Sequence, residues 1–265
     1  MSSQIINPKK YETFAYRFVL LLTLSGLISC GSAKFQNNRI EGKKIAIDNS
    51  IAETPEIANF VAPYRTHIDN DLDSVLAYAP ETMDKSKSIN KWQTTIGNLM
   101  ADVTLQYAEK VFYAREKKHV DICLLNHGGI RAIIPQGNIT ARTAYEVMPF
   151  ENSLIIIALK GEQLLEMADY IIREKKPHPL SGMQILLNKE GFVKSVSVMG
   201  SPVIAQRVYY VATSDYLSNG GDSMDFFKKN VGSYDMDYKL RNLYIDYFKD
   251  VDILPIIRTE RIITE

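Results

Sequence analysis

Apolar side chains recur every three or four residues in three segments of the chain, which is the spacing of one helix face. The segments are residues 66–78, residues 95 to about 110, and residues 163–173. In the first of them the apolar face consists of Ile68, Leu72, Val75 and Leu76. We therefore expect three amphipathic helices, each with its apolar face toward a core.

Dense apolar runs predict buried strands between and after these helices. The run at 154–159 is almost uninterrupted and aliphatic, which is typical of a strand buried on both faces. Shorter runs predict strands at 120–125, 183–187, 193–198 and 209–213. Residues 137–140 have turn chemistry, with a helix start at Thr140, and further turns are predicted at Gly182, Gly191 and Gly200. This order of elements predicts an α/β or α+β fold, with sheets covered by helices.

The N-terminus has the pattern of an export signal. Positive charges at Lys9, Lys10 and Arg17 accompany an apolar run over 18–28, which is shorter than the about 20 residues that a bilayer span requires. Leu27-Ile28-Ser29-Cys30 resembles the bacterial lipobox, in which cleavage precedes a cysteine that becomes lipidated. An ordinary secretory signal or an uncleaved anchor are the alternatives.

The lipobox divides the chain into three parts. We expect residues 1–29 to be a lipoprotein signal peptide, residues 30–59 a polar tether, and residues 60–265 one folded domain. Lipid on Cys30 would anchor the protein in a bacterial cell envelope without crossing the membrane. Gly31 follows Cys30 where an acidic residue is often linked to inner-membrane retention, which favours the outer membrane.

Charge and cysteine content narrow the function classes. Lys and Arg number 31, as do Asp and Glu, so no excess charge favours binding of a nucleic-acid polymer, and a specific small ligand fits better. Apart from Cys30 the only cysteine is Cys123, which excludes a disulfide framework. Because Cys123 lies in an apolar run, we expect it to be a small core residue.

Four short motifs together point to a family. They are Gly-Asn-Leu-Met-Ala-Asp at 97–102, Asn-His-Gly-Gly-Ile-Arg at 126–131, Met-Pro-Phe at 148–150, and the stretch from Ser214 to Met224 with its Gly-Gly-Asp. In combination they resemble the C-terminal, substrate-binding domain of 5′-nucleotidases. The resemblance spans roughly residues 60–260, and it implies a four-layer α/β/β/α arrangement.

The resemblance also implies a nucleoside-binding site. Phe150 and Tyr216 occupy the family's stacking positions, where two rings clamp a purine. Because the chain has 10 Phe and 15 Tyr, most of which are expected in the core, core packing is the alternative for either ring considered alone. Asp222 matches the carboxylate that accepts hydrogen bonds from ribose hydroxyls, or else it caps a helix at 223–229. Arg131 matches the residue facing phosphate or ribose, or else is a solvated charge. The remaining matches are Asn126, which braces its loop or contacts the base, and Asn152 and Gly182, which contact the base edge.

The departures from the family pattern concern phosphate and metal. Ser86 and Asn90 stand where the family carries arginines, with lysines adjacent at positions 85, 87 and 91. The family's phosphatase domain needs two metals held by Asp, His and Asn, but this chain has four histidines and no D-x-H or G-N-H-[DE] string. His127 occupies a position where the family more often has a small residue. We interpret it as a local substitution and not as a metal ligand, because no second ligand stands at coordinating spacing.

Three functions follow from this pattern. The first is a nucleoside- or nucleotide-binding subunit of a split 5′-nucleotidase, without catalytic residues or cofactor of its own, whose divalent metals belong to a separately encoded metallophosphatase subunit. The second is a binding lipoprotein for uptake or sensing that has no catalytic partner. The third is a degenerate domain kept for structure or protein contact.

Overall fold

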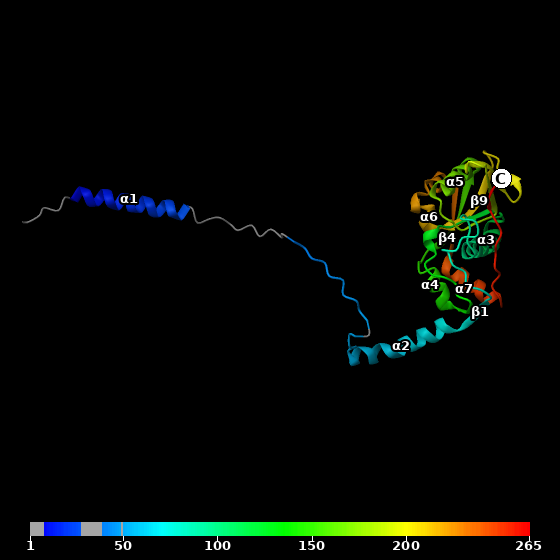
Figure 1. Ribbon diagram of the computed structural model, residues 1–265, viewed down its shortest axis with the longest axis horizontal. Helices are drawn as coiled ribbons and strands as arrows, with labels where there is room; N and C mark the ends of the chain where they lie inside the picture. The colour runs from blue at the N-terminus through cyan, green and yellow to red at the C-terminus, as the bar shows by residue number, and fades with distance from the viewer. Residues whose placement is uncertain (1–7, 28–38, 49) are drawn as a thin grey trace, which may run out of the picture. The chain divides into compact units, whose positions relative to one another are not determined.

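The computed structural model describes residues 8–27, 39–48 and 50–265, and it divides into two units, residues 1–54 and 55–265 (Figure 1). The first unit contains helix α1 (Pro8–Leu27). None of the helices in the described part of the chain is both long enough and apolar enough to cross a membrane. Cys30, the expected lipidation site, lies outside the described residues.

The second unit alternates helices and strands. Its helices are α2 (Pro55–Asp73), α3 (Thr95–Glu116), α4 (Ala141–Val147), α5 (Gly161–Glu174), α6 (Asp215–Ser218) and α7 (Leu240–Asp250), and short 3-10 helices cover His127–Gly129, Gly221–Ser223 and Asp225–Lys229. Its strands are β1 (Val75–Ala79), β2 (Ile122–Leu124), β3 (Gly137–Thr140), β4 (Ser153–Lys160), β5 (Leu180–Ser181), β6 (Met183–Leu187), β7 (Val193–Val198), β8 (Ser201–Pro202), β9 (Val208–Ser214), β10 (Gly232–Lys239) and β11 (Ile262–Thr264). The predicted α/β class is confirmed.

Within residues 55–265 the strands form three sheets. A five-stranded sheet has the order β10-β4-β9-β2-β5, in which β2 and β9 are parallel and the other neighbours are antiparallel. A four-stranded sheet has the order β11-β6-β7-β8, with β11 parallel to β6. Strands β1 and β3 pair separately as an antiparallel ribbon.

Both faces of β4 in the five-stranded sheet are buried, as the uninterrupted run at 154–159 predicts. Leu154 and Ile156 of β4 join a core cluster with α3 and α7, whereas Ile155, Ile157 and Leu159 join a second cluster with α5 and the four-stranded sheet. Side chains alternate between the faces of a strand, so one aliphatic run supplies both cores. In Figure 1, α5 and α7 accordingly lie on opposite sides of β4.

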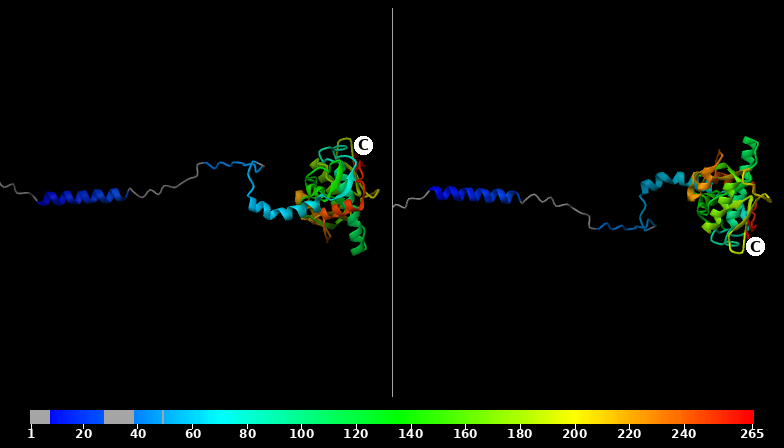
Figure 2. Two further views of the ribbon diagram at one scale, coloured as in Figure 1. Left: turned by 90° about the horizontal axis from the view of Figure 1, so that it is seen from below. Right: turned by 90° about the horizontal axis from the view of Figure 1, so that it is seen from above.

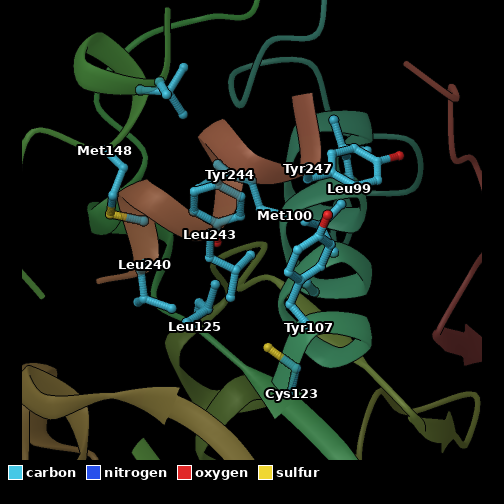
Figure 3. Packing of buried hydrophobic residues seen from close by; sticks show 14 of the residues in the cluster. Leu99, Met100, Tyr107, Cys123, Leu125, Met148, Leu240, Leu243, Tyr244 and Tyr247 are labelled. Atoms are coloured by element: carbon cyan, nitrogen blue, oxygen red, sulfur yellow. The ribbon is translucent and has the colours of Figure 1, made fainter. Parts of the chain in front are cut away.

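Cys123 is a core residue, as its apolar surroundings predict. Its side chain is fully buried on the face of the sheet that α3 and α7 cover. Figure 3 shows its sulfur directed into this cluster, with Leu125, Leu243 and Tyr107 around it. Burial raises the pKa of the Cys123 thiol well above its ordinary value, which keeps it protonated and unreactive.

The motif at 97–102 fixes the C-terminal segment of the chain. Asn98 is buried in α3, and its Nδ2 donates to the carbonyl oxygen of Ile257 over 3.1 Å. Asp102, one turn later, accepts from Ser181 Oγ at 2.5 Å and from a buried guanidinium, that of Arg261, at 2.7 Å. This motif therefore serves the fold and lies outside the pocket described below.

Most of the elements that the sequence predicted are confirmed, and two segments were misassigned. Helices α3 and α5, and the strands expected at 154–159, 183–187, 193–198 and 209–213, are confirmed with ends shifted by a few residues. The helix predicted at 66–78 is wrong in its second half, because α2 ends at Asp73 and β1 follows. The turn predicted at 137–140 is strand β3, which pairs with β1 from Val75↔Thr140 to Ala79↔Gly137.

Helix α2 contacts the rest of its unit mainly near its C-terminal end. Arg142 of α4 donates to Asp69 at 2.7 Å and to Asp73 at 2.5 Å. No residue of α2 is buried, and in both views of Figure 2 the helix extends away from the sheets. The helix begins at Pro55, inside the segment expected to be a tether.

Candidate functional site

One edge of the five-stranded sheet brings together segments that are far apart in the sequence. Strands β2 and β9 run parallel, so both end at this edge, and β4 runs antiparallel to β9, so it begins there. The loop at 126–131 follows β2, residues 150–152 precede β4, and Tyr216 and Asp222 follow β9. The positions of the motifs therefore follow from the strand order.

These segments enclose an open pocket of about 320 Å³. Seven binding residues were predicted from the sequence, all of them in the described ranges, and six line this pocket: Asn126, Arg131, Phe150, Asn152, Tyr216 and Asp222. Gly128 and Gly129 complete the lining. The pocket thus combines two aromatic rings, one carboxylate, one guanidinium and two amides. The charges of Arg131 and Asp222 cancel, so the side chains of the lining carry no net charge.

Gly182, the seventh predicted residue, does not line the pocket. It lies between β5 and β6 with a left-handed φ of +78°. A Cβ on this residue would lie 2.1 Å from the carbonyl oxygen of Asp121, which is backbone and has little freedom to move. The close approach of two backbone segments accounts for glycine here.

Asp222 is the most constrained side chain of the pocket. Tyr216 Oη donates to its Oδ1 over 2.8 Å, and Asn126 Nδ2 donates to its Oδ2 over 2.7 Å. The alternative that Asp222 caps a helix is wrong: Asp225–Lys229 is a 3-10 helix whose N-cap is Met224, and it has no side-chain cap. Asn126 thus braces the site through Asp222.

The rings of the predicted clamp are accessible and held in place. Phe150 is 39% exposed and Tyr216 is 47% exposed, so neither is a core side chain. Behind Tyr216 lies Gly221, where an added Cβ would come within 2.5 Å of the ring. Glycine at that position lets the ring rest against the backbone. Packing as the alternative explanation for these two rings therefore does not hold.

Arg131 lies next to one of these rings. Its guanidinium carbon is 5.8 Å from the centroid of Phe150, within the range of a cation–π contact, and its Nη1 donates to the carbonyl oxygen of Gly128 over 3.3 Å. Lys85 Nζ donates to the carbonyl oxygen of Ile130 in the same loop. By contrast, Asn90 donates to the carbonyl oxygen of Ile262 and takes no part in the pocket lining.

The family model for the 5′-nucleotidase C-terminal domain matches residues 75–229, which is more than half of the chain. The chain belongs to this family. The match begins at β1 and ends after the Gly-Gly-Asp motif, so it contains every residue that lines the pocket.

Relatives and solved structures agree with the assignment to the 5′-nucleotidase C-terminal domain family. The chain is 25% identical over 260 residues to the trifunctional nucleotide phosphoesterase protein YfkN of Bacillus subtilis and 26% identical over 236 residues to the 5′-nucleotidase of Homo sapiens. These matches cover 92% and 78% of this chain but 17% and 40% of the relatives. A 5′-nucleotidase precursor from Thermus thermophilus shares the fold, with a TM-score of 0.65, 24% identity, and coverage of 78% of this chain and 42% of the other.

Sequence reasoning about this 5′-nucleotidase C-terminal domain missed two buried residues behind the pocket. Tyr170 of α5 donates from its hydroxyl to the backbone carbonyl of Asp222 over 2.6 Å. His178 is 4% exposed, and its Nδ1 accepts from the backbone N–H of His127 over 3.2 Å. The inward face of the helix predicted at 163–173 was the signal that would have found Tyr170, while His178 lies outside the predicted elements.

The histidines show no metal-binding arrangement. Within the residues that the structure describes, no three His, Cys, Asp or Glu side chains form a group that would hold a metal ion. His127 instead shapes the loop, since its backbone is tied to His178. Burial lowers the pKa of His127, so the neutral ring is favoured.

Buried His178 makes the stability of the domain depend on pH. Burial, aided by the nearby His127, lowers the pKa of His178 from 6.5 to about 4. Between those values the unfolded chain binds more protons than the folded one, so stability falls as pH falls through this window. We expect the wild type to lose about 2 kcal/mol between pH 7 and pH 5 from this group.

Urea unfolding at the two pH values measures this loss. His178→Asn keeps an acceptor for the His127 N–H but does not titrate, so its free energy of unfolding should change less between pH 7 and pH 5. His67→Asn is the matched control, because it makes the same substitution at an exposed histidine of α2. Equal pH dependence of the wild type and His178→Asn would contradict the prediction.

Proposed function

We propose that this domain binds the nucleoside part of a nucleotide as the binding subunit of a split 5′-nucleotidase. In this proposal a separately encoded metallophosphatase subunit supplies the divalent metals and cleaves the phosphate ester. The observation that supports it is that one pocket is lined by two aromatic rings, a carboxylate and a guanidinium, those of Phe150, Tyr216, Asp222 and Arg131. A base stacks on the rings, ribose hydroxyls donate to the carboxylate, and the guanidinium faces phosphate.

The names of the relatives support the class of ligand. The human relative is a 5′-nucleotidase, and the Bacillus subtilis relative is a nucleotide phosphoesterase. Because the chain spans less than half of each, their hydrolytic activity is not transferred to it. In this proposal lipid on Cys30 anchors this chain, and the phosphatase subunit lies on the same envelope membrane, with the outer membrane favoured.

Calorimetric titration of the full-length chain in detergent with adenosine and AMP tests the proposal. Saturable binding of both would support it, and absence of binding by the folded protein would overturn it. Metal-dependent release of phosphate from AMP by the purified chain, after contaminating phosphatases are excluded, would contradict the split arrangement. A neighbouring reading frame that encodes D-x-H and G-N-H-[DE] motifs would support it. A neighbouring transporter would favour the second candidate, nucleoside capture for uptake or sensing.

The phosphate contribution is a separate prediction. Arg131→Gln removes the guanidinium of the pocket lining while keeping a side chain of similar length. We expect AMP affinity to fall about tenfold, because charge-assisted hydrogen bonds contribute about 1.5–3 kcal/mol and part is recovered by the amide. We expect adenosine affinity to fall by less than about fivefold, because adenosine has no phosphate for the guanidinium to contact.

Titration of both ligands into both proteins measures the difference. Arg115→Gln is the matched control, since Arg115 is an exposed arginine of α3 that does not line the pocket. An equal loss for adenosine and AMP would show that Arg131 supports the loop or Phe150, and that phosphate is not its ligand.

A further inference from the structure

The backbone of Asp222, the residue proposed to bind the ribose, has an unusual conformation. Its φ is +53° and that of Ser223 is +61°, so two consecutive residues other than glycine adopt left-handed conformations. Such conformations cost free energy and persist where surrounding contacts determine them. Because this turn is exposed, specific contacts must hold Asp222 in its conformation.

Four hydrogen bonds hold Asp222 at its backbone and its side chain. Tyr216 Oη donates to Oδ1 and accepts from the backbone N–H of Asp222 over 3.2 Å, while Asn126 Nδ2 donates to Oδ2. The fourth comes from inside the protein, where Tyr170 Oη donates to the carbonyl oxygen of Asp222. Three side chains, Tyr216, Asn126 and Tyr170, thus engage the backbone N–H, the carbonyl oxygen and both carboxylate oxygens of this residue.

Tyr170 is the one member of this set that does not line the pocket. It is buried, and its ring packs against Phe226 at 5.7 Å and His178 at 5.9 Å between centroids. Burial raises the pKa of Tyr170 to about 12, so its hydroxyl remains a donor at neutral pH. A rigid ring on a long helix therefore fixes the backbone of an exposed turn.

The carboxylate of Asp222 has unused hydrogen-bond acceptor sites, and their positions indicate which ligand groups it would bind. A carboxylate oxygen accepts about two hydrogen bonds, and Tyr216 and Asn126 each use one, on different oxygens. One acceptor site therefore remains on each oxygen. Two adjacent acceptors match a ligand with two adjacent hydroxyls, such as the 2′ and 3′ hydroxyls of ribose.

We propose that Tyr170 is a positioning residue that aims the Asp222 carboxylate and thereby makes the pocket selective for ligands with a vicinal diol. The inference rests on the proposed function, because it assumes that a nucleoside occupies the pocket. It goes further by assigning the specificity to a side chain that the ligand does not touch. A merely structural Tyr170 would affect all ligands alike.

The experiment compares adenosine with 2′,3′-dideoxyadenosine, which keeps the base and lacks both hydroxyls. Both are titrated calorimetrically into the full-length wild type and Tyr170→Phe. Tyr170→Phe keeps the buried ring and removes the hydroxyl. We expect adenosine affinity to fall about threefold to tenfold, which is the effect of one hydrogen bond, and dideoxyadenosine affinity to stay within about twofold.

Tyr209→Phe is the matched control. It removes another buried tyrosine hydroxyl, one that accepts from the backbone N–H of Ile204, away from the pocket lining. It should leave the ratio of the two affinities unchanged. A similar loss for both ligands in Tyr170→Phe, or no loss for either, would overturn the inference while wild-type binding still supports the proposed function. Failure of the wild type to bind adenosine would overturn both.

Discussion

Phe150→Ala and Tyr216→Ala are each expected to weaken adenosine binding by about tenfold to a hundredfold, because stacking on one aromatic ring contributes about 1–3 kcal/mol per base. Both rings line the pocket, and both are exposed enough to receive a ligand. Truncation of either ring removes one face of the clamp and leaves the base exposed to water. Calorimetric titration of the full-length variants measures the loss.

Two further variants separate stacking from other effects. Tyr216→Phe keeps the ring and removes only the hydroxyl that donates to Asp222, so it should weaken binding much less than Tyr216→Ala. Phe192→Ala removes a ring that is 69% exposed and does not line the pocket, and it should leave binding unchanged. Full adenosine affinity in both alanine variants of the clamp would contradict a stacking site.

The sequence predicted those elements whose periodicity comes from burial. The face of α5 that includes Leu164, Ala168 and Ile171 is buried, so the helical pattern at 163–173 was informative. The aliphatic run of β4 has apolar contacts on both faces, and it was correctly interpreted as a fully buried strand. In such segments a local pattern directly reflects the core.

The misassigned segments were those whose structure depends on a distant partner. Val75 and Leu76 extended the helical pattern of residues 66–78, yet they lie in β1, a strand that pairs with residues 137–140 far along the chain. Ala77 and Ala79 are the buried positions of β1, and two small alternating residues give a weak strand signal. Pairing between short strands is a tertiary interaction, which overrides local propensity.

The candidate site was predicted from motifs, and the structure explains why those motifs meet. Asn126, Phe150 and Tyr216 lie at the ends of three adjacent strands, so one sheet edge positions them. The hydrogen bonds of Asp222 were not predictable, because Tyr170 is 52 residues away in sequence and belongs to an ordinary amphipathic helix. A pattern of residue types shows which side of a helix is buried, but not which hydroxyl meets which carbonyl.

Gly182→Ala is expected to lower the free energy of unfolding by about 3 kcal/mol or more, the largest stability effect that the structure indicates for a single methyl group. Two costs combine at this position. The residue has a left-handed φ of +78°, and the new Cβ would lie 2.1 Å from the carbonyl oxygen of Asp121. For a domain of this size we expect the melting temperature to fall by about 10 °C.

Gly191→Ala is the matched control, because it shares only one of those costs. Its φ is +85°, and nothing lies within 4 Å of the position of an added Cβ. We expect it to cost about 1 kcal/mol. Thermal melts of both variants, with adenosine titrations well below their melting temperatures, then decide what Gly182 does. If Gly182→Ala is as stable as the control but does not bind adenosine, the result supports the contact to the base edge that the family resemblance implies for Gly182. If it is less stable and its adenosine affinity is unchanged, the glycine serves the close approach of two backbone segments.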